Sequence, residues 1–176
     1  MRLLILLGAC ILVLLPSLVM ADATPTTSTL LPLTNATRAA NGVSGLVDLW
    51  GLDNLAMQRA HYLVARSTPG ADALSHCVNV TEGGPPCPSG NSYVQIAQND
   101  GLLSQAGWVI GENLGLFHSF VPVTLNDPKL REFMQSLWVA SPDHLTNMID
   151  PRFHWYGSAE LRMPSGAIIY VTEFAH

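Results

Sequence analysis

The chain has 176 residues, of which 48% are hydrophobic and 12% are charged, so it carries enough apolar material for one sizeable core. Thirteen acidic residues outnumber eight basic ones, and the formal net charge is −5. Without a cluster of lysine or arginine, this acidic balance argues against a nucleic-acid-binding surface and against a basic patch for anionic lipid.

The N-terminus has the order of an export signal. Residues 3–20 contain no charged side chain and follow Arg2, as the apolar segment follows a basic one in signal peptides. Small residues then allow cleavage after Ala21 or Ala23. Because the apolar run approaches the ~20 residues that span a bilayer, a retained membrane anchor is the alternative. Residues 1–21 are therefore predicted to place the protein outside the cytoplasm, either secreted or tethered to the outer face of the membrane by this segment alone.

The rest of the chain is expected to form one domain. Residues 22–32 are rich in Thr and Pro, which predicts a flexible leader, and residues 33–176 are predicted to be the domain. Cleavage removes Cys10 and leaves Cys77 and Cys87 in a compartment where disulfides persist, so the simplest expectation is one disulfide between them. Such a bond would close a short loop and act as a local clip.

Two helices are predicted in the first part of the domain. Thr34 or Asn35 is expected to cap the first helix, which ends with a left-handed C-cap at Asn41-Gly42. Asp53 is expected to cap the second helix, which runs to about Arg66 with one buried face.

A long irregular stretch follows these helices. Residues 69–107 are rich in Gly, Pro, Ser and Asn and lack sustained periodicity, and loops of this size usually carry function or disorder. A short strand is then expected through Val109 and Ile110 into Gly111-Glu112-Asn113.

The clearest helix comes after this strand. Asp127 is its expected cap and Pro128 takes its first position. Ser141-Pro142 ends it and begins a shorter helix, with Ser141 as cap and His144 in the first turn. Five apolar residues predict a single buried stripe along the longer helix: Leu130, Phe133, Met134, Leu137 and Trp138.

The end of the chain predicts a hairpin, with strands over residues 153–163 and 167–174 joined at Pro164-Ser165-Gly166. Both faces of the second strand carry large apolar side chains, which is expected when helices cover both sides of a sheet. The predicted fold class is therefore α+β, a three-layer α-β-α sandwich with a central antiparallel sheet. Four aromatic residues are expected in the sheet core: Phe153, Trp155, Tyr156 and Tyr170.

Five motifs occur in a fixed order along the domain. They are Asn35-x-x-Arg38 followed by Gly42, His61, Ser75-His76, Gly111-Glu112-Asn113, and Trp138-x-x-Ser141-Pro142-x-His144-x-x-Asn147. Each motif is weak alone, but their order and spacing resemble the SCP-like, or CAP, superfamily of cysteine-rich secretory, antigen 5 and pathogenesis-related proteins, in particular its single-domain bacterial members. The resemblance covers the chain from about Leu33 to Phe174.

The resemblance implies an α-β-α sandwich with a groove that holds two histidines and acidic residues. His76 is similar to the first groove histidine, Glu112 to the glutamate of the Gly-Glu-Asn motif, and His144 to the second histidine. Asn113 and Asp143 are the neighbouring candidates for this groove. These five residues form the predicted binding site.

The chain also departs from the family pattern. Ser141 stands where many eukaryotic members have a second glutamate, and Leu145 stands where an arginine is usual. Asp143 stands where a glycine is usual, so its carboxylate either offers a further ligand beside His144 or is an acid favoured in the first turn by the helix dipole.

The chemistry of the predicted groove leaves two interpretations open. Two imidazoles and a carboxylate suit Zn²⁺ or another divalent cation if His76, His144 and Glu112 converge around an open position for water. Alternatively, the two histidines hydrogen-bond Glu112 and backbone groups and tie the long loop to the core. No other cofactor is indicated.

Three functions are compatible with these observations. The first is a non-enzymatic extracellular module that binds a small apolar ligand, a lipid or a cell-surface component. The second is a metal-dependent hydrolase in which His76 and His144 bind the metal and Glu112 acts as a ligand or general base. The third is a surface interaction domain with a vestigial groove. Neither an HExxH motif nor a G-x-S-x-G nucleophile elbow is present, which favours the binding module.

Overall fold

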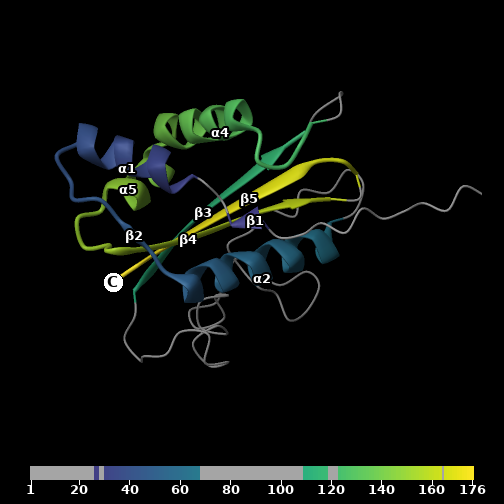
Figure 1. Cartoon of the computed structure of the whole chain (residues 1–176), viewed down its shortest axis with the longest axis horizontal. Coiled ribbons are helices and arrows are strands. Elements are labelled where there is room, and N and C mark those ends of the chain that lie inside the picture. The colour runs from purple at the N-terminus through teal and green to yellow at the C-terminus, as the bar shows by residue number, and fades with distance from the viewer. Residues whose placement is uncertain (1–25, 28–29, 68–108, 119–122, 164) are drawn as a thin grey trace, which may run out of the picture.

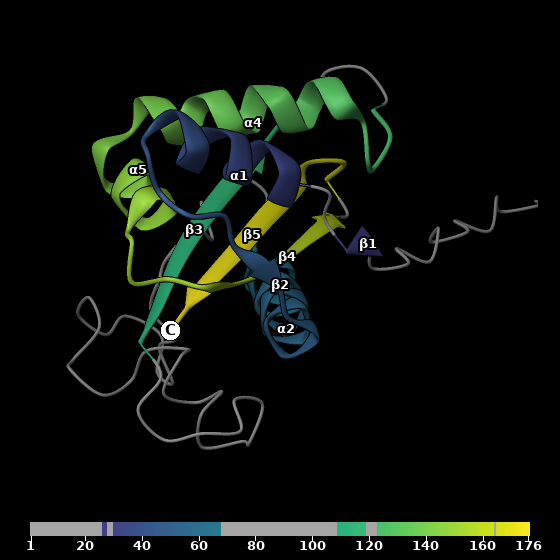
Figure 2. The same cartoon turned by 60° about the vertical axis from the view of Figure 1, so that its left-hand side comes forward.

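A sheet of mainly antiparallel strands lies between two layers of helices in the computed structural model (Figure 1, Figure 2). The structure describes residues 26–27, 30–67, 109–118, 123–163 and 165–176. One face of the sheet is covered by α2 (Trp50–Arg66), and the other by α1 (Leu31–Ala40), α4 (Pro128–Ala140) and α5 (Pro142–Ile149). The predicted α+β sandwich of three layers is confirmed. None of the helices in these ranges has the length and hydrophobicity needed to cross a bilayer.

The strands are β1 (Thr26–Thr27), β2 (Val47–Asp48), β3 (Ile110–Phe117), β4 (Trp155–Arg162) and β5 (Ile168–Ala175). The sheet has the order β1-β4-β5-β3, and all of these neighbours are antiparallel. The short β2 pairs with β4 in parallel and is the exception to the predicted antiparallel arrangement. The predicted hairpin is confirmed as β4 and β5, and Gly166 in its turn has φ of 86°.

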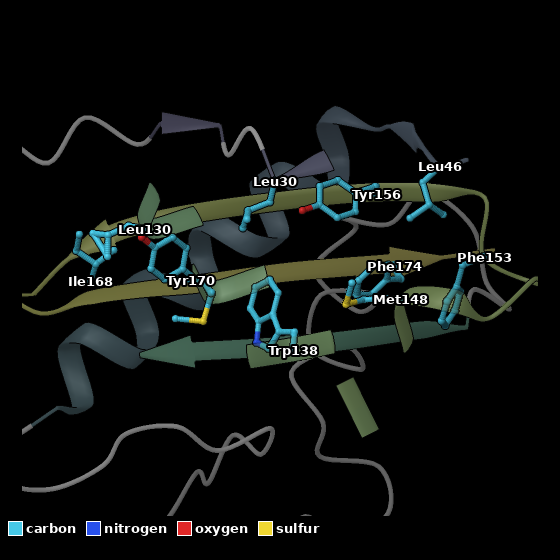
Figure 3. Packing of buried hydrophobic residues seen from close by; sticks show 11 residues of the cluster. Leu30, Leu46, Leu130, Trp138, Met148, Phe153, Tyr156, Ile168, Tyr170 and Phe174 are labelled. Carbon is cyan, nitrogen blue, oxygen red and sulfur yellow. The ribbon is translucent and has the colours of Figure 1, made fainter. Parts of the chain in front are cut away.

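Strand β5 explains why both faces of the sheet need helices, since all eight of its residues are buried. Figure 3 shows Tyr170 and Phe174 projecting from this strand into a cluster with Trp138 on the side of α1, α4 and α5. Ile169 and Val171 belong to a second apolar cluster, which includes buried residues of α2. Because side chains alternate along a strand, the two clusters form the two halves of the core.

The ordered domain begins earlier than expected. Strand β1 pairs with β4, and α1 begins at Leu31, so the structure places elements inside the predicted leader of residues 22–32. Leu30 is completely buried in the core, which fixes this start. Thr34 and Asn35, the predicted caps, lie within α1 instead. The predicted left-handed end is confirmed at Gly42, with φ of 71°.

Helix α2 also begins before its predicted cap. It starts at Trp50, and the carboxylate of Asp53 accepts a hydrogen bond of 2.9 Å from the backbone N–H of Ser158 in β4. The close approach depends on Gly157, where an added Cβ would lie 2.2 Å from the carbonyl carbon of Leu52. Asp53 therefore fastens the helix to the sheet rather than capping it.

Helix α4 begins as predicted, because Asp127 accepts a hydrogen bond of 2.9 Å from the N–H of Lys129. Its predicted apolar stripe is only partly buried, since Phe133 and Leu137 are 48% and 47% exposed. The buried face is rotated toward two polar residues and consists of Leu130, Arg131, Met134, Gln135 and Trp138.

Three further expectations change in detail. Strand β3 is eight residues long and extends beyond the short strand that was predicted. Helix α5 begins after Ser141 as expected, but the hydroxyl of Ser141 makes no capping hydrogen bond. Trp155 is 38% exposed, whereas the other three aromatic residues expected in the sheet core are buried.

Arg38 is a buried link between distant segments. Its guanidinium donates to the carbonyl of Ser44 at 2.6 Å, and to those of Met148, Asp150 and Phe153 at 2.8, 3.0 and 3.0 Å. Burial lowers the pKa of Arg38, but four carbonyl acceptors satisfy the buried cation. One side chain thus joins α1 to the loop before β2 and to the end of α5.

Replacement of Arg38 by methionine should destabilise the protein by at least about 3 kcal/mol, because buried carbonyls lose a charged donor. Urea unfolding of Arg38→Met measures the loss. Arg152→Met is the matched control, since Arg152 pairs with Asp150 on the surface and its side chain is 67% exposed. Equal stability of the two variants would contradict the role of Arg38.

Asp53 makes stability depend on pH. Burial raises the pKa of this carboxyl from 3.8 to about 6, although the hydrogen bond from Ser158 opposes the shift. The unfolded chain releases the proton at lower pH than the folded chain does. The free energy of unfolding therefore falls as pH rises through this window and levels off above it.

The variant Asp53→Asn keeps an acceptor oxygen for the N–H of Ser158 and removes the titration. Between about pH 4 and about pH 7 the wild type should lose on the order of 1–2 kcal/mol relative to this variant. Urea unfolding of both proteins at several pH values tests this. A constant difference between them would show that the pKa of Asp53 is not raised.

Candidate functional site

The structure describes four of the five predicted site residues. Glu112 and Asn113 lie in β3, and Asp143 and His144 lie in the first turn of α5. His76 lies outside the described residues, as do Cys77 and Cys87 with their predicted disulfide. The predicted convergence of His76, His144 and Glu112 therefore stays a prediction.

Two asparagines join the Gly-Glu-Asn motif to α5. The Nδ2 of Asn113 donates to the carbonyl of His144 at 3.1 Å. The Nδ2 of Asn147 donates to the carbonyl of Glu112 at 3.1 Å and to the Oδ1 of Asn113 at 2.9 Å. Gly111 permits this contact, because an added Cβ would lie 3.1 Å from the Oδ1 of Asn147 and 3.0 Å from the ring of Phe153. The two motifs are thus brought together through backbone and amide groups.

Loss of this link should weaken the hold of α5 on the edge of the sheet. Asn147→Ala leaves the buried Oδ1 of Asn113 without its donor, which costs about 1–3 kcal/mol of unfolding free energy. Chemical denaturation measures the cost, and hydrogen exchange of the β3 amides reports where protection is lost. Thr146→Ala is the control, because the exposed Thr146 bonds within its own helix. Similar losses in the two variants would contradict the assignment.

The side chain of Glu112 faces α2 and pairs with Arg59. The Nε of Arg59 lies 2.7 Å from the Oε2 of Glu112, and its Nη2 lies 3.4 Å from Oε1. Arg59 is completely buried and the Glu112 side chain is only 10% exposed. Sequence analysis missed Arg59, although its position between Ala56 and Ala60 on the buried face of α2 signals a charge that needs a buried partner.

A second carboxyl lies beside this ion pair. Glu173 in β5 is the direct cross-strand partner of Glu112 and is 1% exposed. Burial raises the pKa of Glu173 well above its usual range, and repulsion by Glu112 raises it further, while Arg59 opposes the shift. The three side chains therefore form a buried cluster of one guanidinium and two carboxyl groups.

The imidazole of His144 lies in another layer. Its ring centroid is 6.4 Å from that of Trp138, whose Nε1 donates to the carbonyl of Leu114 at 3.1 Å. Trp138 belongs to the core cluster of α1, α4 and α5, whereas Glu112 turns toward α2. His144 is half-buried and Asp143 is exposed. The structure joins the backbones of the Gly-Glu-Asn motif and α5, but the carboxylate of Glu112 and the imidazole of His144 point into different layers.

The described residues do not fit a resident divalent metal ion. Within the ranges that the structure covers, no three His, Cys, Asp or Glu side chains are grouped as metal ligands. Both carboxylate oxygens of Glu112 face the guanidinium of Arg59. A metal ion bound there would have to displace a buried cation from its partner.

Apolar side chains are also exposed on α4. Phe133 and Leu137 lie one helical turn apart on α4 and are about half exposed. The ring of Phe117 in β3 packs edge-on against Phe133, with centroids 6.0 Å apart. We call Phe117, Phe133 and Leu137 the α4 apolar patch. Sequence periodicity placed Phe133 and Leu137 in the core, because it does not show which side of a wide stripe meets the sheet.

No protein-family model and no curated protein matches the chain. Among solved structures, it is similar to an outer surface protein from Borrelia burgdorferi, with a TM-score of 0.60 and 16% identity over 83% of this chain and 88% of that one. It is also similar to an extracellular protein containing an SCP domain from Bacillus anthracis, with a TM-score of 0.54 and 17% identity. That match covers 82% of this chain and 38% of the Bacillus protein.

At these identities the similarity establishes the fold alone. The chain has an SCP-like fold, in agreement with the order of its sequence motifs.

Proposed function

We propose that this chain, which has an SCP-like fold, is an exported and non-enzymatic binding protein for a small apolar ligand such as a lipid acyl chain. The uncharged segment after Arg2, with its small-residue cleavage positions, supports export. The structural neighbours are described as an outer surface protein and an extracellular protein, which supports the same location. Fold and motif order together support membership of the CAP superfamily.

The α4 apolar patch is the observation that carries this proposal. Phe133 and Leu137 flank the buried face of α4 and are about half exposed, and the partly buried ring of Phe117 packs against Phe133 from the strand. Large apolar side chains that are exposed side by side mark binding surfaces more often than isolated ones do. An acyl chain would cover them without requiring a polar partner.

The polar residues of the motifs support binding over catalysis. Arg38, Asn113 and Asn147 direct their side-chain donors to backbone carbonyls and to each other within the fold. The hydrolase alternative needs Glu112 as a metal ligand or general base, and the pairing of Glu112 with Arg59 weighs against both roles.

Lipid capture followed by a binding assay tests the proposal. The purified protein is incubated with a lipid extract, re-isolated and examined by mass spectrometry, and affinity is then measured with a fluorescent fatty acid. The double variant Phe133→Ser and Leu137→Ser should bind at least about tenfold more weakly, because burial of a large apolar side chain contributes about 1.5–3 kcal/mol.

The matched control replaces two exposed apolar residues elsewhere, Val47→Ser and Trp50→Ser, which are 58% and 77% exposed in the wild type. This variant should bind like the wild type. Equal weakening in both double variants would place the ligand outside the α4 apolar patch. Failure of the wild type to retain any lipid would refute the proposal and favour an interaction domain with a vestigial groove.

A further inference from the structure

We propose that Arg59 is the resident cation of the Glu112 site, so that this carboxylate binds a guanidinium of its own chain in place of a divalent metal ion. The inference goes beyond apolar ligand binding, because it assigns Arg59, Glu112 and Glu173 a joint role on the α2 face of the sheet. It predicts that Glu112 does not bind a metal ion, which is the opposite of the metal-site interpretation of the predicted groove.

The contact between Arg59 and Glu112 is a two-point ion pair. Two guanidinium nitrogens, Nε and Nη2, approach the two carboxylate oxygens from one side, at 2.7 and 3.4 Å. A fork that faces both oxygens matches the carboxylate better than a single ammonium does. Metal binding at Glu112 would need the same oxygens.

The position of Arg59 in the fold holds this pair in place. The side chain of Arg59 is 0% exposed, because Arg59 lies on the buried face of α2 together with Ala56 and Ala60. Both of those alanines pack in the core cluster on the α2 side of the sheet. If Glu112 bound a metal ion, the guanidinium of Arg59 would lose its partner and stay buried. An unpaired charge in the core is far less favourable than the charge of a surface arginine, which can turn into water.

Glu173 provides a second carboxyl group beside the guanidinium of Arg59 and the carboxylate of Glu112. It lies directly across from Glu112 in the sheet and is 1% exposed. Two carboxyls on adjacent strands would be the beginning of an oxygen-ligand site for a divalent ion if the buried charge beside them were missing. Arg59 already supplies a positive charge beside these two carboxyl groups, and this charge compensates the negative charge of one of them.

Titration calorimetry with ZnCl₂ and with MnCl₂ tests the proposal. The wild type and Glu112→Gln should give the same isotherm, because Glu112 contributes nothing to metal binding while Arg59 is present. Arg59→Met removes the charge and retains an apolar stem. It should gain a site at least about tenfold tighter than any in the wild type, and this site should disappear in the double variant with Glu112→Gln.

Arg66→Met is the matched control, since Arg66 lies on the exposed side of the same helix, and it should behave like the wild type. If Arg59→Met does not fold, the comparison of wild type with Glu112→Gln still decides. Metal binding by the wild type that falls about tenfold or more in Glu112→Gln would overturn the proposal. A folded Arg59→Met variant that gains no site would overturn it as well.

Discussion

The burial of β5 on both faces is the constraint on which the rest of the structure depends. A strand with eight buried residues cannot lie at the surface of a two-layer protein, so helices must cover each side of the sheet. Tyr170 and Phe174 fill one half of the core, and Ile169 and Val171 fill the other. Helix α2 approaches one face closely enough to require glycine at position 157. The remaining helices close the opposite face.

Charged residues in this core need buried partners, and among the described residues an ion pair lies on each side of the sheet. Arg59 pairs with Glu112 on the α2 side. Arg131 of α4 pairs with the completely buried Glu160 of β4, and the N–H of Asn126 donates to the other oxygen of Glu160 at 3.0 Å. Each pair joins a helix to a strand. Removal of one partner would leave an uncompensated buried charge, so such pairs fix which helix face meets the sheet.

The motif residues that first suggested a groove also have a structural use. Asn35 accepts from the N–H of Leu46 at 2.7 Å and donates to its carbonyl at 3.1 Å, which shapes the loop between α1 and β2. Arg38 joins that loop to the end of α5, and Asn113 and Asn147 join α5 to β3. These hydrogen bonds hold α1, α5 and β3 in a fixed arrangement relative to one another.

The sequence by itself determined the three-layer class, the hairpin of β4 and β5, the start of α4 at Asp127 and the left-handed turn at Gly42, because periodicity, capping and positive φ are local properties. It also placed Glu112, Asn113 and His144 in the elements where they lie. Only the tertiary structure decided their partners. The pairing of Glu112 with Arg59 joins residues 53 positions apart, and the cross-strand position of Glu173 depends on the register of β3 against β5. The exposure of Phe133 and Leu137 likewise follows from the rotation of α4 on the sheet, which a helical period leaves undetermined.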